Sequence, residues 1–335
     1  MFFGIDLSFS TFFMILGFSL ALYSVVSNDV IQTLGAFISS NSKKPFWLIW
    51  AFASVILVIT LSWGWWVNGG DLSFGRLASI PEVTQFHWWH ALPPLVLLFL
   101  TRYGMPVSTT FLVLSVFSSG VVVQKMITKS FMGYIVAFAA AIIVYLLISN
   151  AIEKKFINSE IKNVRLWTAF QWIATGFLWS QWIMHDVANI FVYLPRKVEF
   201  HTLAIVLVLF VALLGVISFI RGGAIQKVVD SKVNTEDIRS ATIIMVIYAF
   251  VLMYFKEMSN IPMSTTWVFI GLLAGREVAI QNRIKHSTTK AVAKGVSLDF
   301  AKTFAGLTVS VLVVQLIMNV LVDLDIAAIL ATIGF

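Results

Sequence analysis

The sequence predicts an all-α polytopic membrane protein of two inverted repeats, each with a broken helix and a re-entrant helical hairpin. Three observations predict this fold: the composition is apolar, two unrelated motifs recur at nearly one interval, and the basic residues fall on one predicted side. Of the 335 residues, 59% are hydrophobic and 12% are charged. Soluble domains carry about a quarter charged residues, so water is not the solvent for most of this surface.

Several apolar runs are long enough to cross a bilayer, which takes about 20 residues each. Two of them cover residues 45–67 and 131–152. The first twenty residues lack the basic region and the cleavage site of a signal peptide, so we expect them to be mature protein. The absence of cysteine excludes disulfides, thiolate metal sites and thiol catalysis. The net charge of +7 comes from short loops, which indicates membrane topology rather than nucleic-acid binding.

Two motifs recur along the chain. An Asn/His-Asp-Val pattern occurs at Asn28–Val30 and again at His185–Val187, and a Pro-x-Ser-Thr-Thr pattern occurs at Pro106–Thr110 and again at Pro262–Thr266. The copies lie 157 residues apart for the Asp motif and 156 for the Pro motif. A shared interval indicates a duplication, as is common in transporters. We therefore predict a first repeat at 1–152, a cytoplasmic linker at 153–165 and a second repeat at 166–335.

Within the first half, the elements follow from apolar runs and their interruptions. We predict a broken helix over 8–40, a span over 45–67, a polar loop around Gly69–Asp71, an apolar stretch over 88–123 interrupted at 104–108, and a last span over 131–152. If the interrupted stretch is a re-entrant hairpin, each half crosses the membrane three times. An odd number of crossings inverts the second half relative to the first.

The basic residues test this topology. Under the hairpin model, 16 of the 23 Lys and Arg residues lie on the side of the linker. Arg102 and Lys256 lie in the hairpins, and five lie on the other side: Arg76, Lys125, Lys129, Arg196 and Lys197. The asymmetry predicts that the linker is cytoplasmic, that both termini are extracytoplasmic, and that the protein lies in the plasma (inner) membrane.

The hairpin motifs have the chemistry of an anion site. A proline stops a membrane helix, and the Ser and Thr residues that follow are good N-caps for a helix that restarts. A restarting helix presents unpaired N–H groups and a partial positive charge, which suit an oxyanion. We expect the two tips to meet near the midplane and to bind substrate through six residues: Ser108, Thr109, Thr110, Ser264, Thr265 and Thr266. The alternative is that these hydroxyls bond only to their own helices.

Two acidic residues lie within apolar helices, where an ionisable side chain indicates a functional site. Asp29 and Asp186 beside an anion require cations between them. We therefore predict cation sites formed by Asp29, Gln32, Asp186 and Asn189 with unwound carbonyls, and substrate contacts from Asn28, Asp29, His185 and Asp186. The cation would be Na⁺ or a proton, with no other cofactor. Alternatively, each Asp pairs with Arg102 or Lys256.

These motifs resemble those of the inorganic phosphate transporter (PiT) family of cation/phosphate symporters, which carries a GANDVAN-like segment and a PVSTTH-like hairpin in each of two inverted repeats. Asp186–Asn189 and Pro106–Thr110 match closely, and Asn28–Val30 and Pro262–Thr266 match nearly as well. The resemblance covers both halves. It implies that the hairpin Ser and Thr residues and the Asn/Asp segments hold phosphate, with Na⁺ or H⁺ nearby.

The sequence departs from the family pattern at specific positions. Gln32 and His185 stand where the pattern has Asn, and the His that follows Ser-Thr-Thr is Phe111 in one copy and Trp267 in the other. These departures leave sulfate or another oxyanion open. His185 titrates near neutrality when unperturbed, so it could favour proton coupling, or it could simply satisfy a carbonyl.

Other readings follow from the same residues. A sulfate permease of the same fold or an oxyanion channel would use the same hairpins, and uphill flux separates a channel from a symporter. A metal-dependent membrane enzyme is more distant: His87 and His90 could meet a metal, but no third ligand is nearby. The predicted partners are an inorganic anion, a coupling cation, the lipid bilayer and a second copy in a homodimer, but no nucleic acid.

Overall fold

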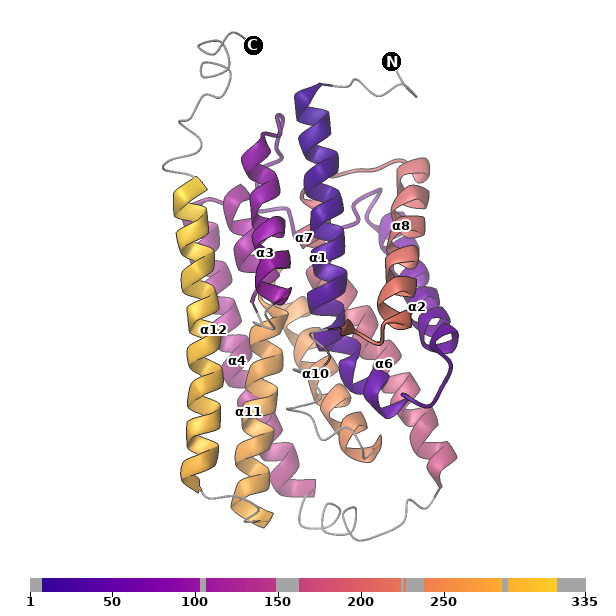
Figure 1. Cartoon of the computed structure of the whole chain (residues 1–335), viewed down its shortest axis with the longest axis vertical. Coiled ribbons are helices and arrows are strands. Elements are labelled where there is room, and N and C mark those ends of the chain that lie inside the picture. The colour runs from indigo at the N-terminus through magenta and orange to yellow at the C-terminus, as the bar shows by residue number, and fades with distance from the viewer. Residues whose placement is uncertain are drawn as a thin grey trace.

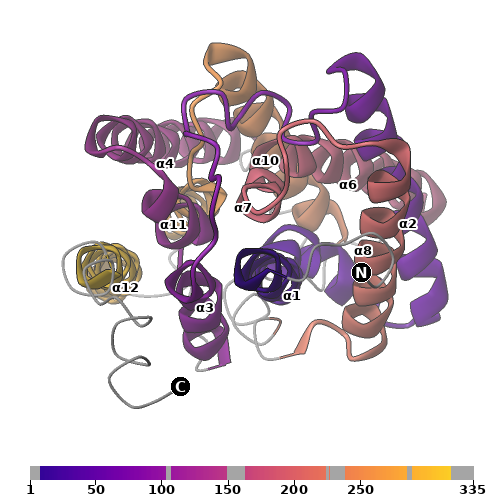
Figure 2. The same ribbon diagram turned by 90° about the horizontal axis from the view of Figure 1, so that it is seen from above.

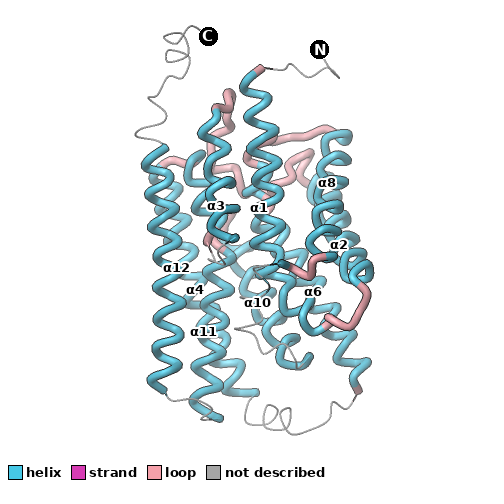
Figure 3. Tube along the Cα trace, viewed as in Figure 1, coloured by secondary structure: helices cyan, strands magenta, loops and turns pink. Residues whose placement is uncertain are grey.

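The regular structure of the described residues is helical (Figure 3). The computed structural model describes residues 8–102, 107–148, 163–223, 226, 238–284 and 289–317. Its first-half elements are α1 (Phe9–Ser40), α2 (Phe46–Val67), η1 (Trp88–Ala91), α3 (Leu92–Arg102), η2 (Thr110–Leu114), η3 (Ser115–Phe117) and α4 (Gly120–Ile148). Its second-half elements are α6 (Val164–Asp186), α7 (Ala188–Phe191), α8 (Phe200–Phe219), α10 (Ile238–Met258), α11 (Thr265–Ile284) and α12 (Thr289–Leu316).

Six helices in the described part of the chain are long and apolar enough to cross a membrane, and they lie in α1, α2, α4, α8, α10 and α12. The protein is therefore an integral membrane protein, as the composition predicted. The helix α6 is not among them because it carries polar side chains such as Gln171, Thr175 and Asp186. Those side chains are buried in the bundle rather than facing lipid.

Two hairpins occupy opposite halves of the molecule. In Figure 1, α3 lies in the upper half and the pair α10 and α11 in the lower half. The length of α10 would permit a full crossing, but the hairpin tip meets the first hairpin partway, where Thr110 donates a hydrogen bond to the Met263 carbonyl at 3.3 Å. Both hairpins are therefore re-entrant.

The packing of the two halves corresponds element by element. The first hairpin packs on α1 through α3 and on α12 through η2, while the second packs on α6 through α10 and on α4 through α11. Figure 2 shows α1 and α7 near the middle of the bundle, with α12 on one flank and α2 and α8 on the opposite one. An inverted repeat requires this correspondence, and the duplication itself stays a prediction.

The first predicted broken helix is wrong, because α1 runs without interruption over 32 residues, through Asp29. No proline lies within it. In the second half, α6 ends at Asp186, but Val187 keeps helical dihedral angles and its N–H still bonds to the Ile183 carbonyl at 3.2 Å. Neither Asp motif therefore offers the unwound carbonyls that we expected.

Two predicted boundaries also shift. The span predicted at 131–152 begins at Gly120, because the Ser118-Ser119-Gly120 turn ends the first hairpin earlier than its apolar pattern indicates. The predicted linker overlaps the first turn of α6, which starts at Val164. Residues 153–162 of that linker and Pro106 lie outside the described residues.

Candidate functional site

Each hairpin motif places a serine where a helix restarts. The Ser108 hydroxyl accepts a hydrogen bond from the Phe111 N–H at 3.3 Å, and the Ser264 hydroxyl accepts one from the Trp267 N–H at 3.3 Å. A side-chain oxygen that accepts from the N–H three residues later is the N-cap bond. The predicted capping role of the Ser residues is therefore present in both copies.

The two restarts differ in length, which the sequence did not indicate. The second leads into α11, a helix of 20 residues. The first is a single π-helical turn, η2, followed by the three-residue 3₁₀ turn η3. Because a helix dipole is the sum of aligned peptide dipoles, only α11 can supply the full partial charge of about +0.5. The two expected donor clusters are therefore unequal.

The aromatic residues that follow the Ser-Thr-Thr runs join the two hairpins. The rings of Phe111 and Trp267 lie edge to face, with centroids 5.8 Å apart and an interplanar angle of 84°. Both side chains are buried. Edge-to-face pairs stabilise by about 0.5–1.5 kcal/mol beyond the burial of their area. Phe111 and Trp267, which replace the histidine of the family pattern, thus form an apolar contact between the two hairpin tips.

Asp186 lies where the hairpins meet. Its Oδ2 accepts a hydrogen bond from the Thr265 hydroxyl of the second hairpin. Its Oδ1 accepts a long hydrogen bond from the Asn189 amide at 3.4 Å and lies 3.5 Å from the Thr110 hydroxyl of the first hairpin, whose single proton is shared with the Met263 carbonyl. Asn189 also donates to the Thr110 hydroxyl at 3.3 Å. One carboxylate therefore connects α6, α7 and both hairpins.

Asp29 has fewer partners. Its Oδ1 accepts from the Asn28 amide at 2.7 Å, and the Thr109 hydroxyl lies close enough to interact with the carboxylate electrostatically. Neither Asp29 Oδ2 nor Thr109 Oγ1 has a partner with the distance and angles of a hydrogen bond. The carboxylates of Asp29 and Asp186 are close enough to repel each other when both are ionised. The arrangement of Asp29 beside Thr109 parallels that of Asp186 beside Thr265.

The remaining amides of the first Asp motif tie it to the first hairpin. Asn28 donates to the Val107 carbonyl at 3.3 Å, and its own Oδ1 accepts from the Gln32 amide at 3.1 Å. Gln32 therefore reaches the site through Asn28. The structure brings together these predicted residues and leaves each no more than 6% exposed: Asn28, Asp29, Gln32, Ser108, Thr109, Thr110, His185, Asp186, Asn189, Ser264, Thr265 and Thr266.

His185 points its imidazole at a backbone group. Nε2 lies 2.7 Å from the Leu252 carbonyl oxygen, which can only accept, so Nε2 carries the proton. Nδ1 is buried without a hydrogen-bond partner. His185 thus satisfies a carbonyl of α10, which is the simpler of the two roles that the sequence left open.

Several oxygen atoms around Asp29 and Asp186 lack partners. The unpaired buried oxygens are Asp29 Oδ2, Thr109 Oγ1 and Asn189 Oδ1. Leaving a buried polar group unpaired costs about 1–3 kcal/mol. Carboxylate, hydroxyl and amide oxygens are ligands that hard cations prefer. This donor set fits Na⁺, and protonation of a carboxylate would relieve the same repulsion.

The predicted alternative partners of the two Asp residues do not reach them. Arg102 is exposed at the end of α3, and Lys256 forms an ion pair with Glu257 at 2.9 Å. The buried cation that interacts with Asp186 is Arg76, from the loop after α2. The sequence pattern did not single out Arg76, because a basic residue in a polar loop usually faces water.

Lys129 and Tyr248 were also missed. Lys129 lies in α4 and is 5% exposed, although a lysine beside an apolar run suggests an interfacial residue. The Tyr248 hydroxyl, on the buried face of α10, donates to the Thr265 carbonyl at 3.1 Å. A tyrosine in an otherwise apolar helix face is the one signal that could have indicated Tyr248.

The metal-enzyme alternative gains no support from geometry. The His90 Nδ1 accepts a hydrogen bond from the His87 backbone N–H at 2.9 Å, so it serves a turn. Among the described residues, no three His, Cys, Asp or Glu side chains are grouped to hold a metal ion.

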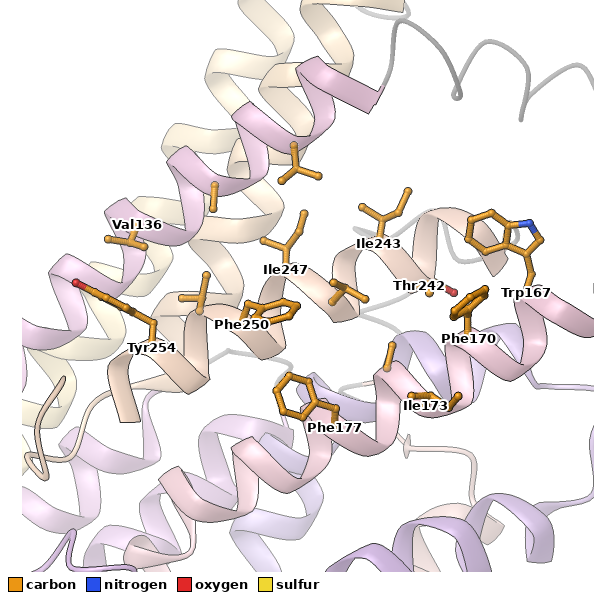
Figure 4. Close-up of a pocket in the computed structure, with 15 residues that line it drawn as sticks. Val136, Trp167, Phe170, Ile173, Phe177, Thr242, Ile243, Ile247, Phe250 and Tyr254 are labelled. Atoms are coloured by element: carbon orange, nitrogen blue, oxygen red, sulfur yellow. The ribbon is translucent and has the colours of Figure 1, made fainter. Parts of the chain in front are cut away.

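A large cavity lies away from these polar residues. Its volume is about 760 Å³, and it opens between α4, α6 and α10 (Figure 4). Its lining includes Val136, Phe170, Ile243 and Phe250 and is almost entirely apolar. A hydrated anion would not enter such a groove, so we assign it no role in solute binding.

Comparison with known proteins identifies a solved structure with the same fold. No protein-family model matches the chain, and no curated protein matches it. A solved structure described as "The sodium-dependent phosphate transporter" superposes with a TM-score of 0.61, over 93% of this chain and 99% of the other, at 17% sequence identity. The two proteins share a fold. The superposition extends over most of the chain, so the shared fold includes both halves.

Proposed function

We propose that this chain is a secondary active transporter that moves inorganic phosphate, or a similar tetrahedral oxyanion, together with Na⁺ or H⁺. One observation carries the proposal: the Thr110 and Thr265 hydroxyls, from hairpins that enter from opposite ends, both lie within hydrogen-bonding distance of the Asp186 carboxylate. The shared fold with a sodium-dependent phosphate transporter supports it. The chain would then be a divergent relative of the PiT family.

The anion would bind at the start of α11. The N-terminus of a long helix presents unpaired N–H groups and positive potential, and a tetrahedral oxyanion accepts from both backbone and hydroxyl donors. Thr109 adds to this anion site a buried hydroxyl that has no partner with the distance and angles of a hydrogen bond. Ser264 stays a helix cap in this arrangement, so its contribution is to fix the start of α11.

The cation would bind at the carboxylates. Asp29 and Asp186 repel each other when both are ionised, and a cation between them removes the repulsion. The anion then gains a positively charged neighbour, so binding of one solute favours binding of the other. This mutual dependence is the physical basis of symport. Na⁺ fits the oxygen ligands, and a proton is the alternative.

Uptake into proteoliposomes tests the proposal. Purified protein should accumulate labelled phosphate against its concentration gradient when a Na⁺ or H⁺ gradient is imposed, and sulfate should be compared in the same vesicles. An oxyanion channel would only equilibrate the label. Failure to take up either anion under both gradients would refute the transport function.

Substitutions test which residues are needed for gradient-driven uptake. Asp29→Asn and Asp186→Asn should abolish gradient-driven uptake while the protein stays folded, because each removes a cation-binding charge. Ser264→Ala should reduce it less, since it loses a cap rather than a ligand. Glu199→Gln is the control, because Glu199 is exposed on the loop before α8. Normal uptake by both Asp variants would exclude the proposed cation site.

A further inference from the structure

Two buried cations contact the tip of the second hairpin. The Arg76 side chain is 1% exposed and that of Lys129 is 5% exposed. Arg76 Nη1 donates to the Ser259 carbonyl at 2.6 Å, and Lys129 Nζ donates to the same oxygen at 2.8 Å. Lys129 also donates to the Ile261 carbonyl at 2.8 Å. Cations from a loop and from α4 therefore converge on one carbonyl, just before the Ser-Thr-Thr motif.

The loop that carries Arg76 is rigidly built. Asp71 accepts from the Ser73 N–H at 2.7 Å and from the Gly75 N–H at 2.9 Å. Phe74 and Gly75 adopt positive φ angles of 55° and 73°, which turn the chain sharply before Arg76. A Cβ on Gly75 would lie 3.3 Å from the Asn260 amide, so the loop touches the hairpin tip. Arg76 is thus held in place rather than free to move to solvent.

Among the described residues, neither cation has a carboxylate in direct contact. Lys256, at the end of α10, instead pairs with Glu257 at 2.9 Å. Arg76 also donates weakly to the Met184 carbonyl at 3.4 Å, two residues before Asp186. Burying a charge against neutral dipoles alone is costly. The retained charges must therefore be compensated at longer range, and Asp186 is an attractive neighbour of Arg76.

Arg76 is charged at neutral pH. Burial lowers its pKa to about 10, and Asp186 and then Glu257 oppose that shift. The guanidinium therefore projects a permanent positive potential toward the point where α6 ends and the second hairpin turns. A potential of this sign attracts an anion and repels a cation.

We propose that Arg76 and Lys129 are the charge-selecting pair of the transporter: the positive charge of Arg76, and that of Lys129 in its protonated form, strengthen binding of the anion and weaken binding of the cation at Asp186. This inference rests on the proposed function and identifies further positioning residues for it. The pair acts through potential rather than as ligands, since both side chains already donate to the hairpin backbone. Its charge sets how the site divides its affinity between the two solutes.

The signature of such a pair is a change of opposite sign for the two solutes. Removing one positive charge should raise the KM for phosphate and lower the concentration of coupling cation that gives half-maximal uptake. Each change should be on the order of tenfold, as expected for a unit charge at short range in a partly desolvated site. A distortion of the hairpin alone would weaken the binding of both solutes.

The test uses Arg76→Gln and Lys129→Gln, which remove the positive charge and leave an N–H donor on a shorter side chain. Arg76→Lys restores the charge and should return both constants toward the wild-type values. Lys125→Gln is the matched control, because Lys125 lies one turn earlier on α4 and is exposed. Uptake in proteoliposomes gives the phosphate KM and the cation dependence for each protein.

The outcomes are distinct. Opposite shifts in Arg76→Gln and Lys129→Gln, absent from Lys125→Gln, support the inference. Unchanged constants, or two constants that move in the same direction, overturn it while wild-type uptake leaves the proposed function intact. Absence of wild-type uptake would instead refute the proposed function. If Arg76→Gln fails to fold, Lys129→Gln decides the question, with thermal unfolding in detergent as the check on folding.

Discussion

The Thr110 hydroxyl of the first hairpin donates to the Met263 carbonyl of the second at 3.3 Å. The residues are 153 positions apart in the sequence and belong to segments that enter the bundle from opposite ends. This contact brings the two Ser-Thr-Thr motifs to one place, between two buried carboxylates. Every prediction about the site depends on that meeting.

Thr265→Ala should lower uptake more than Thr265→Ser. Thr265 donates to Asp186 Oδ2, and alanine leaves the buried carboxylate with only its long hydrogen bonds to Thr110 and Asn189. A hydrogen bond to a charged group contributes about 1.5–3 kcal/mol, so kcat/KM should fall about 10- to 100-fold in the alanine variant. Serine keeps the hydroxyl and should retain most activity. Thr168→Ala is the control, because its hydroxyl bonds only to Val164 on an exposed face.

Ser264→Ala should destabilise the start of α11 and leave α4 intact. The hydroxyl caps the Trp267 N–H, and its removal should cost about 1 kcal/mol. The Ser264 backbone N–H still donates to Ser130 at 2.8 Å, so the hairpin should stay anchored. Hydrogen exchange should therefore speed up in the first turn of α11 only. Equal exchange in both proteins would show that the cap is dispensable.

Much of the site could be predicted from the sequence because it depends on repeated motifs. The interval between the copies paired Asp29 with Asp186, and proline before Ser-Thr-Thr indicated a restarting helix. Both inferences use local chemistry that the chain carries in one segment. The structure places those residues together, although their roles in binding stay predictions.

The rest could not be predicted because it depends on long-range packing. Arg76 belongs to a loop whose sequence reads as exposed, and only the fold places it at the hairpin tip 183 residues later. The continuity of α1 could not be predicted for a related reason: whether a polar segment interrupts an apolar helix depends on the side chains that pack against it. Asn28 and Thr109 provide polar neighbours for the Asp29 carboxylate, so the helix does not have to break there.

Low pH should destabilise the protein through His90. Burial lowers the pKa of His90 to about 4 from the usual 6.5, with the His87 carbonyl opposing and the His87 side chain adding to the shift. The neutral ring is needed because Nδ1 accepts the His87 N–H. Above pH 6.5 the ring is neutral in both the folded and the unfolded state, so His90 does not lower the free energy of unfolding. As the pH falls to 4, the unfolded state binds the proton first, and the free energy of unfolding falls by about 3 kcal/mol.

Thermal unfolding in detergent between pH 4 and 8 measures this effect. His90→Asn keeps an acceptor that does not titrate, so its stability should fall less than that of the wild type below pH 6.5. His201→Asn should follow the wild type, because His201 is exposed beside Glu199. Parallel curves for wild type and His90→Asn would assign the acid sensitivity to other groups.

Gly271→Ala should be the most destabilising of these substitutions, because α11 touches the backbone of α4 there. A Cβ on Gly271 would overlap the Tyr134 carbonyl oxygen, and one on Gly275, a turn later, would overlap the Phe138 carbonyl oxygen. Small residues four apart let membrane helices approach closely, and packing rather than the hydrophobic effect holds them together. Overpacking costs about 1–3 kcal/mol, which corresponds to a fall in Tm of roughly 2–12 °C.

Gly120→Ala is the matched control, because Gly120 begins α4 and a Cβ there would meet nothing within 4 Å. Its Tm should stay close to that of the wild type. Because α11 begins at Thr265, a displaced helix would also move the hydroxyl that donates to Asp186. Gly271→Ala should therefore lose uptake together with stability, whereas a variant with normal Tm and normal uptake would show that α4 and α11 can separate without disturbing the site.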